Sequence, residues 1–89
     1  MIERELTVAN RLGLHARATA KLVQLLAPFH SSVTLAAKGR EINAKSIMGV
    51  MLLAAGQGTL VKLRVEGSDE VEVADAIASL FERSFDEDG

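Results

Sequence analysis

Stretches in which apolar and polar residues alternate are interleaved with stretches of helical spacing, and this order is the strongest constraint on the fold. The alternation is most regular in residues 60–66, where valine and leucine alternate with charged residues. Residues 2–8 and 32–37 show the same period of two, which is typical of strands with one buried face. Residues 40–43 follow a Lys-Gly turn, so we expect them to complete a hairpin with the strand before them.

The first helical stretch lies between the first two predicted strands. Apolar side chains at Ala20, Val23 and Ala27 are three and four residues apart and predict a helix over residues 16–27. Leu22 and Leu26 widen this apolar stripe. Pro28 ends this helix, because the residue before a proline disfavours the helical region. The loop that leads into the helix contains asparagine and glycine, which are common in turns.

Two further helices are predicted in the second half of the chain. Residues 47–54 form a short helix with Ser46 at its N-cap position. Ser68 or Asp69 caps the last helix. Its apolar face consists of Val73, Ile77, Leu80 and Phe81. Residues 86–89 form an acidic tail that we expect to be frayed.

The order of elements is β-α-β-β-α-β-α, which predicts an α+β fold. We expect an open-faced β-sandwich, in which a four-stranded antiparallel sheet is covered on one face by three helices. The 89 residues allow one domain, spanning residues 1–89. With 48% hydrophobic and 25% charged residues, the chain has the composition of a soluble globular protein.

Composition and charge exclude several classes of function. The net charge is −2, the basic residues are scattered, and the three aromatic residues are all phenylalanine, which argues against nucleic-acid binding. Residues 1–7 carry charges where a signal peptide has an apolar core, and the nearly apolar residues 47–55 are too short to cross a bilayer. We therefore expect a cytoplasmic protein without membrane insertion.

Metal and cofactor sites are not expected either. The chain has no cysteine, which excludes disulfides and thiolate metal ligands. His15 and His30 have no third ligand at a suitable spacing, so we predict no metal site. We interpret His30 as structural or solvated, and we expect no cofactor.

Residues 13–17, Gly-Leu-His-Ala-Arg, place His15 immediately before the first predicted helix. The first backbone amides of that helix, those of Ala16, Arg17 and Ala18, lack intrahelical partners and favour an anion. The Arg17 guanidinium can bind the same anion. Because neutral imidazole is a nucleophile near pH 7, His15 could carry a phosphoryl group. A solvated cap histidine would show the same local pattern, so spacing alone leaves both interpretations open.

Residues 13–17 resemble the active-site stretch of HPr, the phosphocarrier family of the bacterial phosphotransferase system. Residues 43–49, Asn-Ala-Lys-Ser-Ile-Met-Gly, resemble the second signature of the same family. The separation of the two motifs and the order of elements also match over almost the whole chain. Two motifs in the right order make the resemblance specific.

The resemblance implies a role for each matching position. His15 would accept a phosphoryl group on Nδ1 from the phosphorylated histidine of enzyme I and pass it to a histidine of an enzyme IIA protein or domain. Arg17 would steady the phosphoryl group. The protein would be a transfer intermediate in sugar uptake or its regulation, without turnover of its own. The sequence does not set the oligomeric state, and a monomer is the default expectation. Many family members have proline where this chain has Ala18, and we expect no loss of carrier function from that difference.

The second motif carries two further expectations. Ser46 matches the serine that HPr kinase/phosphorylase phosphorylates in family members regulated in this way, besides its role as an N-cap. Ile47, Met48 and Met51 are expected to stay exposed and dock partner proteins, with Ala20 and Lys21 extending the surface from the first helix. Methionine suits a surface that accepts several partners, because its side chain repacks easily.

Three other functions remain open from the sequence. A regulatory or nitrogen-related phosphorelay carrier would use the same two motifs without sugar transport. A small ligand-binding or interaction module of similar architecture would not need His15. A metal-dependent hydrolase is the third alternative, but the chain has no ligand cluster or acid/base pair at convincing spacing.

Overall fold

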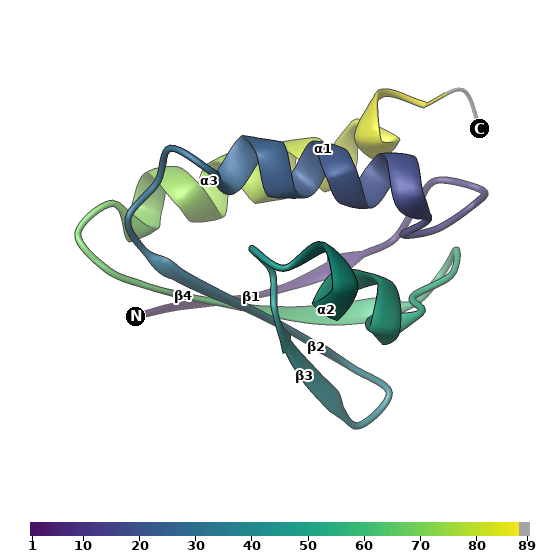
Figure 1. Cartoon of the computed structure of the whole chain (residues 1–89), viewed down its shortest axis with the longest axis horizontal. Helices are drawn as coiled ribbons and strands as arrows, with labels where there is room; N and C mark the ends of the chain where they lie inside the picture. Colours follow the sequence, from purple (N-terminus) through teal and green to yellow (C-terminus); the bar gives the residue numbers. More distant parts are fainter. Residues whose placement is uncertain (88–89) are drawn as a thin grey trace.

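The computed structural model describes residues 1–87 and confirms the predicted order of elements. The elements are β1 (Ile2–Thr7), α1 (Ala16–Leu26), β2 (Ser32–Ala37), β3 (Arg40–Asn43), α2 (Ile47–Leu53), β4 (Leu60–Glu66), α3 (Glu70–Glu82) and the short 3-10 turn η1 (Ser84–Asp86). The strands form one antiparallel sheet in the order β1-β4-β2-β3 (Figure 1). The expected α+β open-faced sandwich is therefore confirmed.

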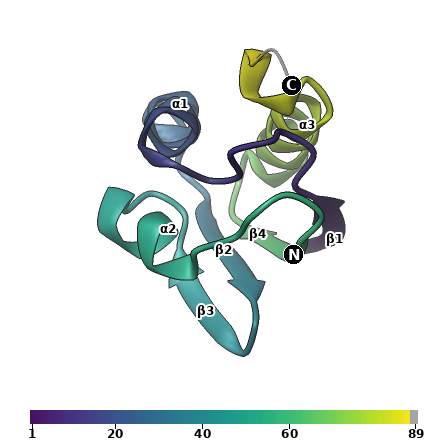
Figure 2. The same ribbon diagram turned by 90° about the vertical axis from the view of Figure 1, so that its right-hand side faces the viewer.

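The three helices cover the same face of the sheet, which Figure 2 shows end-on. The core lies between the two layers, because alternate side chains of each strand point towards the helices. On β4, Val61, Leu63 and Val65 are buried and their neighbours are exposed. The predicted apolar face of α3 is buried against them. Within residues 1–87, none of the helices has the length and apolar character needed to span a membrane.

The buried face of α1 agrees with the predicted stripe at Leu22 and Leu26 and differs from it elsewhere. Its buried residues are Ala18, Thr19, Leu22 and Leu26. Ala20 and Val23 are only half-buried, and Ala27 is exposed. Thr19 can be buried because its hydroxyl donates to the carbonyl oxygen of Leu14 at 3.2 Å. This local hydrogen bond satisfies the hydroxyl, so a threonine can occupy a core position on α1.

The segment after α3 is folded back, where the sequence predicts a frayed tail from residue 86. Ser84, Phe85 and Asp86 have φ values of 53, 56 and 60° and form a left-handed turn. Phe85 is fully buried, with its ring centroid 4.9 Å from that of Phe81. Burial of this ring offsets the backbone strain of the turn. The prediction is wrong for Asp86 and Glu87, and residues 88–89 lie outside the described part of the chain.

Asp69 lies at the N-cap position of α3, but its side chain does not cap the helix as predicted. Its carboxylate accepts hydrogen bonds from the backbone N–H groups of His30 and Ser31, both at 2.9 Å, and from the Ser31 hydroxyl. These contacts tie the start of α3 to the loop after α1. The hydrogen bond from the Ser31 side chain, followed by that from the His30 backbone, holds the pKa of Asp69 below its usual range.

We expect Asp69 to stabilise the fold at neutral pH and to lose this contribution in acid. Because the folded protein binds the Asp69 proton less tightly than the unfolded chain, the stabilisation is present above about pH 4 and declines as the pH falls through the folded-state pKa. Urea unfolding should show the Asp69→Asn variant less stable than the native protein at pH 7. This difference should shrink at pH 3. An equal difference at both pH values would contradict the assignment.

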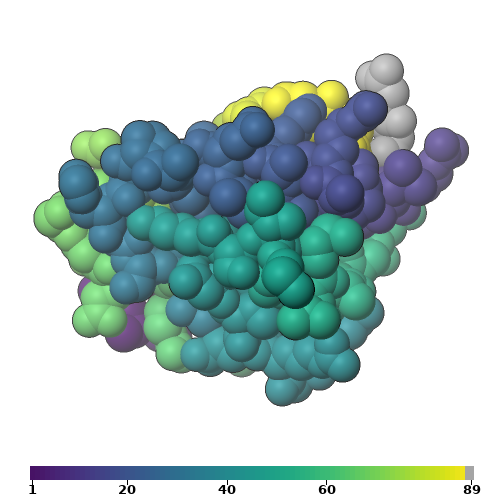
Figure 3. Space-filling model, in the orientation of Figure 1, coloured from purple at the N-terminus to yellow at the C-terminus, as the bar shows by residue number. Residues whose placement is uncertain are grey.

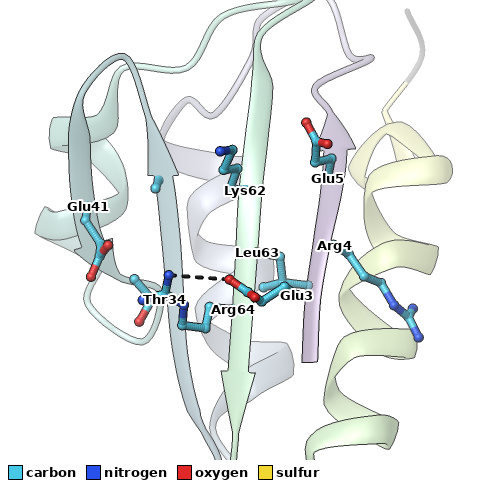
Figure 4. A pocket seen from close by; sticks show the side chains of 9 residues that line it. Glu3, Arg4, Glu5, Thr34, Glu41, Lys62, Leu63 and Arg64 are labelled. Atoms are coloured by element: carbon cyan, nitrogen blue, oxygen red, sulfur yellow. Dashed lines mark hydrogen bonds and ion pairs between the residues drawn. The ribbon is translucent and has the colours of Figure 1, made fainter. Parts of the chain in front are cut away.

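The uncovered face of the sheet carries charged side chains of both signs, and a shallow hollow lies on it (Figure 4). Arg64 and Glu3 on neighbouring strands form an ion pair at 3.4 Å. Glu5 lies opposite Lys62 in the register of β1 and β4. These exposed pairs keep the open face solvated and contribute little to stability.

Candidate active site

His15 is the N-cap residue of α1, with extended backbone angles of −75 and 179°. Its carbonyl oxygen accepts the first helical hydrogen bond, from the N–H of Thr19 at 2.9 Å. Its ring nitrogen Nδ1 accepts a weaker hydrogen bond from the N–H of Arg17 at 3.3 Å. The predicted position at the helix start is thus confirmed, and Nδ1 faces the positive end of the helix.

The loop before His15 is packed tightly against the loop after α2. Gly13 has a φ of 67°, and a Cβ atom built on it would lie 2.5 Å from the carbonyl oxygen of Ala55. The N–H of Leu14 donates to that same oxygen at 2.9 Å. Asn10 is fully buried and donates to the carbonyl oxygen of Gly13 at 2.7 Å. This packing fixes the backbone that leads into His15.

Glu87 contacts the other ring nitrogen of His15, and nothing in the sequence indicated this. Its Oε2 lies 2.6 Å from Nε2 of His15, and the two side chains are 13% and 28% exposed. Its Oε1 accepts from the side-chain amide of Asn10 at 2.9 Å. Partial burial alone would raise the pKa of Glu87. The hydrogen bonds from Asn10 and His15 and the charges of His15 and Lys21 outweigh that effect, so its pKa lies below the usual value.

Basic side chains surround the outer side of the histidine. A shallow hollow beside His15 is lined by three basic residues, Arg11, Arg17 and Lys21, and by the two carboxylates of Asp86 and Glu87. Arg17 is exposed, as a residue that meets an incoming anion must be. The Lys21 ammonium group donates to the carbonyl oxygen of Phe85 at 2.7 Å. Lys21 is therefore engaged with the C-terminal turn in this structure. The three cations outnumber the two carboxylates, so the hollow keeps a net positive charge that favours an anion.

Besides Arg17, the sequence predicts that the amides of Ala16 and Ala18 bind an anion, and these two residues differ in exposure. Ala16 is exposed and Ala18 is fully buried. Their N–H groups lie in the first turn of α1, ahead of the first helical hydrogen bond. Such amides are available to an anion seated at the helix start.

Ser46 caps α2 as the sequence predicts. Its hydroxyl oxygen accepts from the N–H of Gly49 at 3.1 Å, and the side chain is half-buried. The C-cap residue of α2 is Ala54, which takes a left-handed conformation with a φ of 52°. The last helical residue is Leu53, one position before the predicted end.

The predicted docking residues of α2 are exposed. Ile47, Met48 and Met51 have exposed fractions of 52, 76 and 42%, whereas Val50 and Leu53 are buried in the core. Leu52 is also exposed and was not predicted. We call Ile47, Met48, Met51 and Leu52 the α2 patch. Figure 3 shows α2 in teal directly beside α1 in blue, and Ala20 on α1 is half-buried. The patch and the histidine thus belong to adjoining helices.

The remaining histidine contributes no comparable site. His30 is exposed, and its backbone N–H donates to Asp69. Among residues 1–87, no cluster of three histidine or carboxylate side chains is placed to hold a metal ion. The arrangement around His15 instead offers an unprotonated ring nitrogen, free amides and cations, which suits the positioning of a phosphoryl group.

Comparisons with known proteins agree with this chemistry. The family model described as "PTS HPr component phosphorylation site" matches residues 2–83. The chain is 62% identical over 88 residues to the phosphocarrier protein HPr of Xylella fastidiosa strain Temecula1, covering 99% of each chain. It is 52% identical to that of Cupriavidus necator, covering 98% of each. The crystal structure of HPr-C-His from Thermoanaerobacter tengcongensis superposes with a TM-score of 0.95 at 42% identity and full coverage of both chains.

Proposed function

The chain belongs to the HPr family of phosphocarrier proteins of the phosphotransferase system, and on this basis we propose that His15 carries the phosphoryl group, on Nδ1. The observation that carries the proposal is the hydrogen bond from the Arg17 N–H to Nδ1. An amide donor there requires an unprotonated nitrogen with an available lone pair, which is the state that attacks phosphorus.

The first turn of α1 would then hold the transferred group. The amides of Ala16, Arg17 and Ala18 offer donors, and the helix dipole adds partial positive charge. The exposed Arg17 guanidinium offers charge-assisted hydrogen bonds to the phosphoryl oxygens. Phosphoryl transfer needs positioning and charge stabilisation more than covalent chemistry, so these few groups suffice.

We propose that enzyme I is the donor and that enzyme IIA proteins or domains of sugar uptake are the acceptors. In this proposal residues 1–89 act as one carrier unit in the cytoplasm, without a cofactor or turnover of their own. We propose that this unit acts as a monomer. The acceptors would distinguish this role from a purely regulatory or nitrogen-related relay.

We propose that both kinds of partner dock on the α2 patch, with Ala20 and Lys21 at its edge. Four large apolar side chains are exposed on a helix that adjoins α1. Brief transfer complexes bury small interfaces in which a few apolar residues supply most of the affinity. Flexible methionine side chains can fit the surfaces of several partners.

We expect the Met48→Ala variant to raise the KM for phosphorylation by enzyme I about tenfold, because Met48 is the most exposed residue of the patch. The matched control is Val71→Ala on α3, which is 58% exposed and lies outside the patch. Initial rates at increasing carrier concentration give both KM values. Equal KM values for the two variants would contradict docking at this patch.

We also propose Ser46 as a site of regulatory phosphorylation by HPr kinase/phosphorylase. Its hydroxyl lies at the N-terminus of α2, where the helix favours a phosphate, and directly precedes the α2 patch. About two negative charges there would disturb docking with acidic partner surfaces. Intact-mass analysis of the protein isolated from its own cells would reveal the acid-stable phosphate that this proposal requires.

Peptide mapping tests the central proposal. The purified protein is incubated with enzyme I and labelled phosphoenolpyruvate, then digested at neutral or alkaline pH. The label should be acid-labile and reside in the peptide that contains His15. Label in the His30 peptide, or none from a donor that phosphorylates another HPr protein, would overturn the proposal and favour an interaction module.

A further inference from the structure

Both ring nitrogens of His15 form hydrogen bonds, one with a donor and the other with an acceptor. The backbone N–H of Arg17 is a donor and points at Nδ1 at 3.3 Å. The carboxylate of Glu87 lies 2.6 Å from Nε2. An ionised carboxylate can only accept, so Nε2 must carry a proton in this contact. Both contacts therefore select the same ring tautomer, with the proton on Nε2 and the lone pair on Nδ1.

Glu87 is held in place from several sides. Its Oε1 accepts from Asn10, which is fully buried and is itself bonded to Gly13. The turn before it is anchored by the buried ring of Phe85. Lys21 donates to the carbonyl oxygen of Phe85 at 2.7 Å. The carboxylate is thus placed by the fold rather than by chance contact of a free chain end.

We propose that Glu87 is a positioning residue for phosphoryl transfer, which keeps the proton of neutral His15 on Nε2 and so presents the lone pair of Nδ1 to the donor. This inference rests on the proposed carrier role of His15. A carboxylate that orients a histidine in this way fixes both the tautomer and the angle of the ring. Glu87 does not touch the phosphoryl group itself.

The transfer step balances without loss of a proton from the ring. The Nδ1 lone pair attacks the phosphorus atom of the donor's phosphohistidine. The Nδ1–P bond forms while the donor's N–P bond breaks, and that bond's electron pair stays on the donor nitrogen. The phosphorylated His15 ring keeps its Nε2 proton and becomes cationic, and the Glu87 carboxylate faces this charge. Onward transfer returns the electron pair of the Nδ1–P bond to Nδ1.

Nitrogen-15 NMR of the unphosphorylated protein tests the positioning role without any donor. At a pH where the imidazole is neutral, the native His15 should show a protonated Nε2 and an unprotonated Nδ1. In Glu87→Ala both resonances should move towards the averaged positions of the exposed His30 in the same spectrum. Glu87→Gln keeps an acceptor without the charge and should retain the Nε2 proton. The control Glu82→Gln removes a charge from an exposed residue of α3 and should leave the His15 resonances unchanged.

The rate of phosphorylation by enzyme I provides the second readout. We expect Glu87→Ala to lower kcat/KM by at least about tenfold, since small errors in the attack geometry are costly. The kcat/KM of Glu87→Gln should lie between those of Glu87→Ala and the native protein. The kcat/KM of Glu82→Gln should equal that of the native protein. Native ring resonances in Glu87→Ala would overturn the proposal, including when the rate falls, because Glu87 would then act on the partner. Absence of label on His15 in the native protein would instead refute the carrier role.

Discussion

The His15→Ala variant is expected to accept no phosphoryl group from phosphorylated enzyme I. Alanine removes the ring whose Nδ1 is held against the first turn of α1, and the hollow beside it then keeps only guanidinium, ammonium, carboxylate and aliphatic side chains among the described residues. None of these groups replaces a neutral imidazole at the start of the helix. The surrounding amides and Arg17 can stabilise a phosphoryl group but cannot form a bond to phosphorus. The acid-labile label on His15→Ala should fall to background, which means that phosphorylation by enzyme I is lost completely.

His30→Ala is the matched control for this experiment. It removes the other histidine of the chain, which is exposed and whose backbone N–H donates a hydrogen bond to Asp69. We expect it to be labelled at the native rate. Labelling of His15→Ala, or loss of labelling in His30→Ala with a native circular dichroism spectrum, would place the phosphoryl group elsewhere.

The Gly13→Ala variant is expected to have a free energy of unfolding lower by about 3 kcal/mol. The φ of 67° costs a residue with a side chain about 1–2 kcal/mol. The new Cβ would also lie 2.5 Å from the Ala55 carbonyl oxygen and 2.7 Å from Cα of Gly56. Both neighbours are backbone atoms, so relieving the clash must shift one of two packed loops, at a cost of about 1–3 kcal/mol.

The Gly39→Ala variant separates the conformational cost of a positive φ from the cost of the steric clash. Gly39 also has a positive φ, of 76°, but a Cβ built there meets no atom within 4 Å. We expect this variant to lose only the conformational cost, about 1 kcal/mol. Urea unfolding followed by circular dichroism measures both variants. Equal losses would show that the packing of residues 10–14 against the loop after α2 contributes nothing, and that the backbone before His15 is less constrained than the structure indicates.

Most of the fold could be predicted because its signals are local. The alternation in residues 60–66 sets the face of β4, and Pro28 limits α1. Ser46 caps α2 through a bond to a residue only three positions away. The placement of His15 and Arg17 followed in the same way, since both belong to one turn of helix. Features that depend on one segment and its near neighbours are encoded within a short window of the chain.

The missed features depend on side-chain hydrogen bonds, one between distant segments and one within a short stretch of the chain. Asp69 was predicted to cap α3, but it binds the backbone of His30 and Ser31, almost forty positions earlier. Thr19 replaces more apolar neighbours in the core because a hydrogen bond to Leu14 satisfies its hydroxyl. Neither partner could be identified before the chain was folded, since many residues in the sequence could have served.

Glu87 is the largest omission at the site itself. In the sequence it stands in an acidic run, which is typical of a solvated chain end. The only signal that could have indicated otherwise is Phe85, a large apolar residue in a polar segment. Burial of the Phe85 ring requires the chain to turn back onto the protein. The position of Phe85 in the sequence does not reveal which surface of the protein the chain then contacts. The contact with His15, 72 residues away, therefore needed the three-dimensional structure.

The folded-back C-terminal segment determines which chain terminus is suitable for a fusion, a label or immobilisation on a surface. The N-terminal ammonium group is bound to Glu70 at the start of α3, at the opposite end of the molecule from the first turn of α1 (Figure 1). A tether, label or fused domain joined before residue 1 would stand well clear of His15. One joined after residue 89 would be attached only two positions beyond Glu87, whose side chain lies against the imidazole. Sensors or affinity surfaces built on this protein should therefore be anchored through its N-terminus.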